Sequence, residues 1–135
     1  MANISWSTSI QVAGGPTISI TEGPIAAEAT DHIEVSIPAS EDEDSVTEVN
    51  LQPGPATGIH LLSIKSSHYG DGTNITFKTN DGTGGDSEPI NLSGPQFYSG
   101  GAIALFEQEP KILKFSNSST SAVQIEIFVA RDATP

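Results

Sequence analysis

Histidine and serine are the residue types in this chain that could support acid–base, metal or nucleophilic chemistry. The three histidines, His32, His60 and His68, lack the His-x-x-x-His spacing that places two imidazole ligands on one helical face. No Gly-x-Ser-x-Gly sequence is present, so the turn that exposes a nucleophilic serine is not predicted. We therefore interpret the histidines as surface or strand-edge residues. We expect no enzymatic activity, no catalytic residue, no cofactor and no metal.

The loop at residues 80–86 has the residue types of a calcium site. Its sequence, NDGTGGD, combines the carboxylates of Asp81 and Asp86 with glycines that can bend tightly around a cation. The EF-hand pattern is absent, and the repeat of calcium-binding β-rolls is matched only in part and in one copy. We interpret the segment as a hairpin loop and keep calcium binding as the alternative.

Three aromatic residues could form a platform for a sugar or for a neighbouring subunit. Trp6 shares an alternating face with Ile4 and Ile10, which favours a place in the core. Phe97 and Tyr98 are adjacent, and adjacent side chains point to opposite faces of a strand. One of these two rings is therefore expected outside the core, available to a subunit or a ligand.

The chain is strongly acidic, with 17 acidic against 5 basic residues and a formal net charge of −12. Such a charge disfavours binding to nucleic acid and to anionic membranes, so neither partner is expected. The run at residues 41–44, EDED, could hold a cation or meet a basic partner. Because four adjacent carboxylates repel each other, we interpret it as a solvated loop.

The composition indicates one all-β domain. The chain has 135 residues, enough for a single core, and contains 17 serines, 12 threonines, 13 glycines and 9 prolines. Hydroxyl and turn-forming residues suit exposed strand faces and turns better than helix interiors. Cysteine is absent, which excludes a disulfide framework and thiolate metal ligands.

Period-two alternation predicts eight to ten short strands over residues 1–135 and no helix longer than two turns. The strands are expected at residues 4–12, 17–21, 32–38, 46–51, 58–66, 74–79, 89–92, 97–106, 112–116 and 123–129. Their spacing favours an antiparallel, jelly-roll-like β-sandwich, with an immunoglobulin-like sandwich as the alternative. The expected core residues are Ile33, Val35, Ile37, Ile64, Phe77, Phe115, Ile125 and Ile127.

Three stretches carry a resemblance to a known group of proteins. They are QVAGGP at residues 11–16, LLSIKSS at 61–67 with its continuation through ITFKTND and INL, and LKFSN at 113–117 followed by AVQIEI. Together they resemble small β-rich structural proteins encoded beside capsid genes in tailed bacteriophages, several of which are capsid decoration or cement proteins. The similarity covers most of the chain through short motifs, and this group supplies no catalytic residues to carry over.

The resemblance implies a non-enzymatic virion protein on the capsid exterior, with the major capsid protein and further copies of itself as partners. Capsid lattices present local three-fold sites, which makes a trimer the expected oligomer. The first residues show no basic and apolar leader pattern, so we expect synthesis in the host cytoplasm and a final location on the virion. The alternative is a carbohydrate- or receptor-binding module of a tail fibre, with Tyr98 and the loop at residues 80–86 as its candidates.

The termini are the predicted capsid contacts. Residues 1–5 and 131–135 are expected as short arms outside the core, free to become ordered on binding. Asn3 and Ile4 would act from the first arm, and Arg131 and Asp132 from the second. Arg131 is the only arginine and is suited to pairing with a capsid carboxylate. Phe97 and Tyr98 are the predicted subunit contacts, whereas residues 41–44 are expected to stay outside every contact surface.

Overall fold

The computed structural model describes residues 2–42, 45–51, 58–70, 73–106, 108 and 110–132. Strands dominate these residues, and one 3₁₀ helix, η2 (Gly100–Leu105), follows the eighth strand. The strands are β1 (Ala2–Gln11), β2 (Thr17–Ala27), β3 (Ala29–Ile37), β4 (Thr47–Asn50), β5 (Ile59–Ser66), β6 (Ile75–Asn80), β7 (Ile90–Asn91), β8 (Gln96–Ser99), β9 (Ile112–Asn117) and β10 (Val123–Arg131). Within the described part of the chain, no helix is long and apolar enough to cross a membrane.

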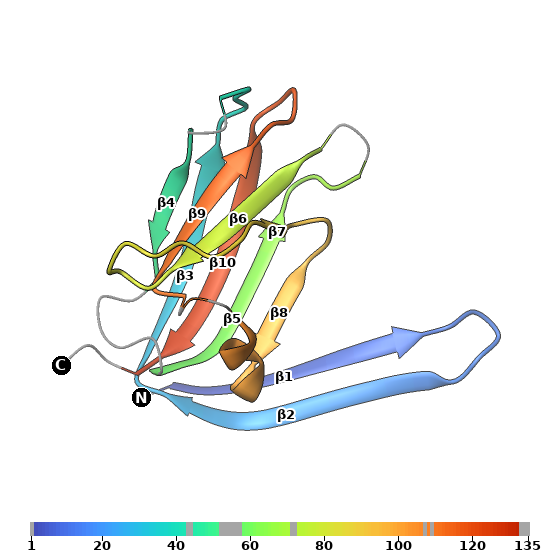
Figure 1. Ribbon diagram of the computed structural model, residues 1–135. Helices are drawn as coiled ribbons and strands as arrows, with labels where there is room; N and C mark the ends of the chain where they lie inside the picture. The colour runs from blue at the N-terminus through green and yellow to red at the C-terminus, as the bar shows by residue number, and fades with distance from the viewer. Residues whose placement is uncertain are drawn as a thin grey trace.

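Two four-stranded antiparallel sheets form the body of the molecule (Figure 1). The first sheet has the order β3-β10-β5-β8, and the second has the order β4-β9-β6-β7. Successive strands from β3 to β10 therefore alternate between the sheets, except that β6 and β7 are neighbours in the second. This order is that of a jelly roll, so the predicted all-β, jelly-roll-like sandwich is confirmed and the immunoglobulin-like alternative is not adopted.

Alternating side chains from both sheets fill the core between them. Ile64 and Ile127 come from the first sheet, and Phe77 and Phe115 come from the second. Phe77 lies directly opposite Phe115 on the neighbouring strand, with ring centroids 5.7 Å apart. This packing explains why the period-two pattern identified the core. Six of the eight predicted core residues are buried, namely Ile37, Ile64, Phe77, Phe115, Ile125 and Ile127.

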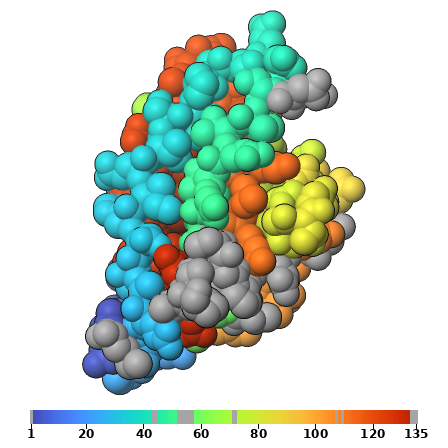
Figure 2. Space-filling model, turned by 90° about the vertical axis from the view of Figure 1, so that its left-hand side faces the viewer, coloured from blue at the N-terminus to red at the C-terminus, as the bar shows by residue number. Residues whose placement is uncertain are grey.

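Ile33 and Val35, the other two predicted core residues, are only partly buried and pack against the core cluster. Both lie on β3, which is an edge strand of the first sheet and has a neighbour on one side only. Figure 2 views the side of the molecule on which the edge strands β3 and β4 lie. The end of β3 and the start of β4 lie at one end of the sandwich, and the start of β1 and the end of β2 lie at the other (Figure 1).

The hairpin of β1 and β2 leaves the body and projects past its edge (Figure 1). We call residues 2–27 the arm. Its two strands pair antiparallel from Ala2 opposite Ala27 to Gln11 opposite Thr17, and Gly14, with φ at 76°, lies in the connecting turn. The prediction of a free N-terminal segment needs correction here, because residues 2–5 already lie in β1. Met1 lies outside the described residues.

The predicted strand at residues 97–106 is wrong beyond Ser99. The chain leaves β8 at Gly100, whose φ of 57° lies in the left-handed region that glycine adopts without steric cost. The next residues form η2, and Ile103 and Phe106 then pack against the core as partly buried side chains. The glycine pair at residues 100–101 therefore ends the strand instead of forming a bulge within it.

The core assignment makes a prediction for β10. Replacing Ile127, which is 0% exposed, by alanine should lower the free energy of unfolding by about 2–5 kcal/mol, because the lost contacts leave a cavity between the sheets. Ile125→Ala should behave alike. The control is Val46→Ala at an exposed position, which should change the free energy by less than about 0.5 kcal/mol. Denaturant titration measures all three, and a loss below about 0.5 kcal/mol for both isoleucine variants would contradict this core.

Candidate functional site

The base of the arm packs against the outer face of the first sheet. Leu61 of β5 and Ala130 of β10 point away from the core, yet both are buried together with Ala27. Ile4, Trp6, Ile25 and Phe128 are partly buried against this small cluster. A hydrophobic contact outside the main core therefore holds the arm on the body.

Trp6 connects the arm to β8 through an aromatic contact. Its ring meets Phe97 edge to face, with centroids 4.8 Å apart and an interplanar angle of 62°. Phe97 is 43% exposed and lies on the outer face, whereas Tyr98 is half buried and turns towards the core and Phe106. The expectation that adjacent rings point to opposite faces agrees with this arrangement. The predicted core position of Trp6 is wrong, because Trp6 packs against the cluster of Ala27, Leu61 and Ala130 outside the main core.

The distal part of the arm presents an apolar face that no other described segment of the chain covers. Ile10 lies directly opposite Ile18, and Thr8 lies opposite Ile20, so these side chains share one face. The exposed fractions are 48% for Ile10, 51% for Ile18 and 46% for Ile20. Val12, at the tip, is 57% exposed. The other face carries hydroxyl side chains, among them the opposed pair Ser9 and Ser19.

The arm also lacks charged side chains over most of its length. Residues 2–21 contain no aspartate, glutamate, lysine, arginine or histidine, although the whole chain carries a net charge of −12. The first acidic residue, Glu22, lies opposite Trp6 near the base of the arm. The apolar face and the absence of charge therefore coincide in the same segment, and this segment is the candidate functional site.

The predicted C-terminal arm is ordered where the structure describes it. Arg131 is the last residue of β10, and its guanidinium group lies 3.1 Å from the Asp31 carboxylate. The backbone amide of Asp132 donates to the Gly58 carbonyl oxygen, and its carboxylate lies 2.7 Å from His60 Nε2. The expectation of a free segment from residue 131 is thus corrected for Arg131 and Asp132. Residues 133–135 lie outside the described residues, and a capsid role for Arg131, Asp132, Asn3 and Ile4 stays a prediction.

The histidines lie at three separate places. His32 and Lys65 both approach one oxygen of Glu126, at 3.5 and 3.3 Å. With Glu34, His32 and Glu126 form the one group of possible metal ligands found among the described residues. The Lys65 ammonium, followed by His32, holds the pKa of Glu126 below its ordinary value. We interpret this group as a surface ion pair, since a cation already neutralises the central carboxylate.

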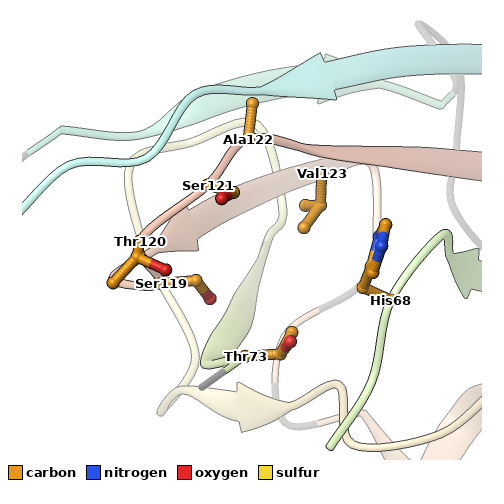
Figure 3. Close-up of a pocket in the computed structure, with 7 residues that line it drawn as sticks. All are labelled: His68, Thr73, Ser119, Thr120, Ser121, Ala122 and Val123. Atoms are coloured by element: carbon orange, nitrogen blue, oxygen red, sulfur yellow. The ribbon is translucent and has the colours of Figure 1, made fainter. Parts of the chain in front are cut away.

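His68 lines a small pocket of about 190 Å³ between two turns of the sandwich (Figure 3). The other lining residues carry hydroxyl or methyl groups and are Thr73, Ser119, Thr120, Ser121, Ala122 and Val123. Among the described residues that line this pocket there is no carboxylate and no lysine or arginine. The pocket therefore does not bring together an acid, a base and a nucleophile.

The loop at residues 80–86 uses its polar groups internally. The Asp81 carboxylate accepts hydrogen bonds from the Thr83 amide and hydroxyl, which hold the pKa of Asp81 below its ordinary value. The Asn80 side chain donates to Asp86, and Lys114 Nζ lies 3.0 Å from Asp86. These two contacts lower the pKa of Asp86 in the same way. The segment is a hairpin loop stabilised by hydrogen bonds among its own residues, and an antiparallel β-bridge between Asn80 and Asp86 closes it.

Tyr98 does not form the open stacking surface that a sugar-binding module would use. Its ring packs against Phe106 at a centroid distance of 4.5 Å, and its hydroxyl donates to the Gln96 side chain. Burial raises the pKa of the Tyr98 hydroxyl. Of the two predicted contact aromatics, Phe97 is the accessible one.

Comparisons with protein-family models, with curated proteins and with solved structures found no match for this chain. The arm is therefore characterised by its own geometry and chemistry. Sequence reasoning missed it, because the alternating isoleucines of residues 4–20 were interpreted as sandwich strands. The available signal was the long uncharged stretch in an otherwise acidic chain.

The ion pair of Asp86 makes a pH-dependent prediction. Asp86→Asn should lower the free energy of unfolding at neutral pH, because it removes the contact with Lys114. Since the pKa of Asp86 in the folded protein lies below the ordinary 3.8, its stabilisation is present above that pH. This stabilisation is lost as the pH falls through the pKa of Asp86 in the folded protein. The difference in the free energy of unfolding between wild type and Asp86→Asn should therefore narrow under acid conditions.

Thermal unfolding of wild type and Asp86→Asn over an acid-to-neutral series tests this dependence. Glu41→Gln is the control, because it removes one exposed carboxylate from the acidic run and reports the effect of net charge alone. A difference in melting temperature between wild type and Asp86→Asn that stays constant down to strongly acid pH would contradict a stabilising ion pair between Asp86 and Lys114.

Proposed function

We propose that this protein is a non-enzymatic structural protein of a tailed-phage virion, which binds the capsid exterior as a decoration or cement protein. Its partners are the major capsid protein and further copies of itself, in a trimer. The observation that carries the proposal is the arm, which projects from a small acidic β-sandwich and whose distal apolar face carries no charged side chain. This combination suits a protein that works by attachment to other protein surfaces.

The distribution of charge supports attachment through the arm. A trimer would carry three times the formal charge of −12, which opposes association wherever carboxylates approach each other. At physiological ionic strength the screening length is about 8 Å, so only charges near a contact matter. A surface made of residues 2–21 avoids this repulsion, and the acidic body disfavours contact with packaged nucleic acid.

The fold and the resemblance of the short motifs support the same proposal. Jelly rolls occur in viral capsid proteins and in lectins, so the fold is compatible with a virion role without specifying it. The short motifs at residues 11–16, 61–67 and 113–117 resemble those of phage decoration proteins. The polar groups of the loop at residues 80–86 are engaged in hydrogen bonds within the chain, and Tyr98 is half buried. Both observations favour this proposal over the sugar-binding alternative.

Quantitative mass spectrometry of purified virions from the encoding phage tests the proposal. A decoration protein that fills local three-fold sites should be present in a copy number comparable to that of the major capsid protein. A tail protein measured in the same digest serves as the internal reference for a low-copy component. A handful of copies per particle would overturn capsid decoration and favour the tail-fibre alternative.

A further inference from the structure

We propose that the distal arm, residues 8–20, docks through its apolar face against the distal arm of a second copy of this chain. The inference rests on the homo-oligomer that the proposed function includes, and it does not require a capsid. It names the contact surface, which is the face that carries Ile10, Ile18 and Ile20.

The distal arm needs a cover that the described part of its own chain does not supply. A two-stranded hairpin is marginally stable in water unless a further strand or a packed layer buries its apolar face. The base of this hairpin has such a layer, because Ile4, Trp6 and Ile25 pack on the outer face of the first sheet. Beyond Trp6 no described residue of the body packs on this face, and Ile10, Ile18 and Ile20 remain about half exposed. The docking surface is thus continuous with an interface that already exists within the chain.

Charge indicates which partner provides the cover. A basic partner would be drawn to the acidic body and would gain nothing from a segment that lacks charged side chains. A second copy of the chain is repelled by the acidic body, and residues 2–21 form the stretch where it can approach without opposing charges. The arm therefore matches a partner with the same acidic character as the chain itself.

The shape of the apolar face fits a copy of itself. Directly opposed residues place Ile10 beside Ile18 and Thr8 beside Ile20, which gives a surface of β-branched side chains standing on a two-stranded sheet. Two such faces can stack as sheets do in a sandwich, at a separation of about 10 Å. Two copies stacked in this way share the patch across a two-fold axis, whereas in the proposed trimer three such faces turn towards the common axis and each arm meets both neighbours there.

Two pairs of substitutions separate the faces of the arm. Ile10→Asp with Ile18→Asp places two opposed charges on the apolar face, and Ser9→Asp with Ser19→Asp places an equal pair on the hydroxyl face. Both variants add the same charge and the same cross-strand repulsion. Only the isoleucine variant introduces charge into the proposed contact. A third variant, Ile10→Thr with Ile18→Thr, keeps β-branched side chains and adds no charge.

The purified full chain is examined by analytical ultracentrifugation over a range of micromolar concentrations. Wild type and the serine variant should sediment as the same oligomer, and the isoleucine-to-aspartate variant should sediment as a monomer. The threonine variant should raise the dissociation constant at least about tenfold, which corresponds to about 1.4 kcal/mol. Circular dichroism confirms that each variant keeps its sandwich.

A monomeric wild type at every concentration would overturn the inference, as would equal dissociation by the serine and isoleucine variants. An oligomer that survives all of the isoleucine substitutions would also overturn it, because the contact would then lie elsewhere. These outcomes leave the copy number on virions unaffected, so failure of the arm contact is distinguishable from failure of capsid decoration, which that copy number tests.

Discussion

The arrangement of this protein depends on β10, which is buried along its inner face and, at Ala130, on its outer face as well. The inner face of β10 contributes Ile125 and Ile127 to the core between the sheets. Its outer face contributes Ala130, which is buried beside Leu61 beneath the base of the arm. Because β10 also pairs with β3 and β5, this one strand connects the core, the first sheet and the attachment of the arm. The base of the arm is therefore part of the hydrophobic packing of the body.

This attachment determines how the apolar surface is presented. The contact between Trp6 and Phe97 and the small cluster around Leu61 hold the base of the arm on the first sheet. The distal part of the β1–β2 hairpin, to which Ile10, Ile18 and Ile20 belong, then projects past the edge of the sandwich (Figure 1). Since exposed charges act only over about a screening length, the uncharged distal part of the arm is separated from most of the repulsion that the acidic body generates. Shape and charge thus make the same segment available for contact.

The alternation of side chains predicted most of the strands and the composition of the core, because each buried face leaves a period-two pattern. It did not separate the arm from the body, since Ile10 and Ile18 show the same pattern as buried residues although both are about half exposed. The alternation of apolar and polar residues distinguishes the two faces of a strand, but it does not show which segment packs against each face. The strand end at Gly100 was missed for a different reason, because it depends on one backbone dihedral angle.

The candidate site could be predicted from the sequence only through its lack of charged residues. Long strands with an open edge and no charge invite pairing with other chains, and proteins commonly place charged residues there to prevent it. The arm has ten and eleven residues in its strands, a single pairing between them in the described part of the chain, and no charged side chain before Glu22. A chain with 17 acidic residues has ample means to protect this edge. The absence of acidic residues from residues 2–21 fits a surface that is covered in the assembled state, where a charge would be buried without a partner and would oppose association.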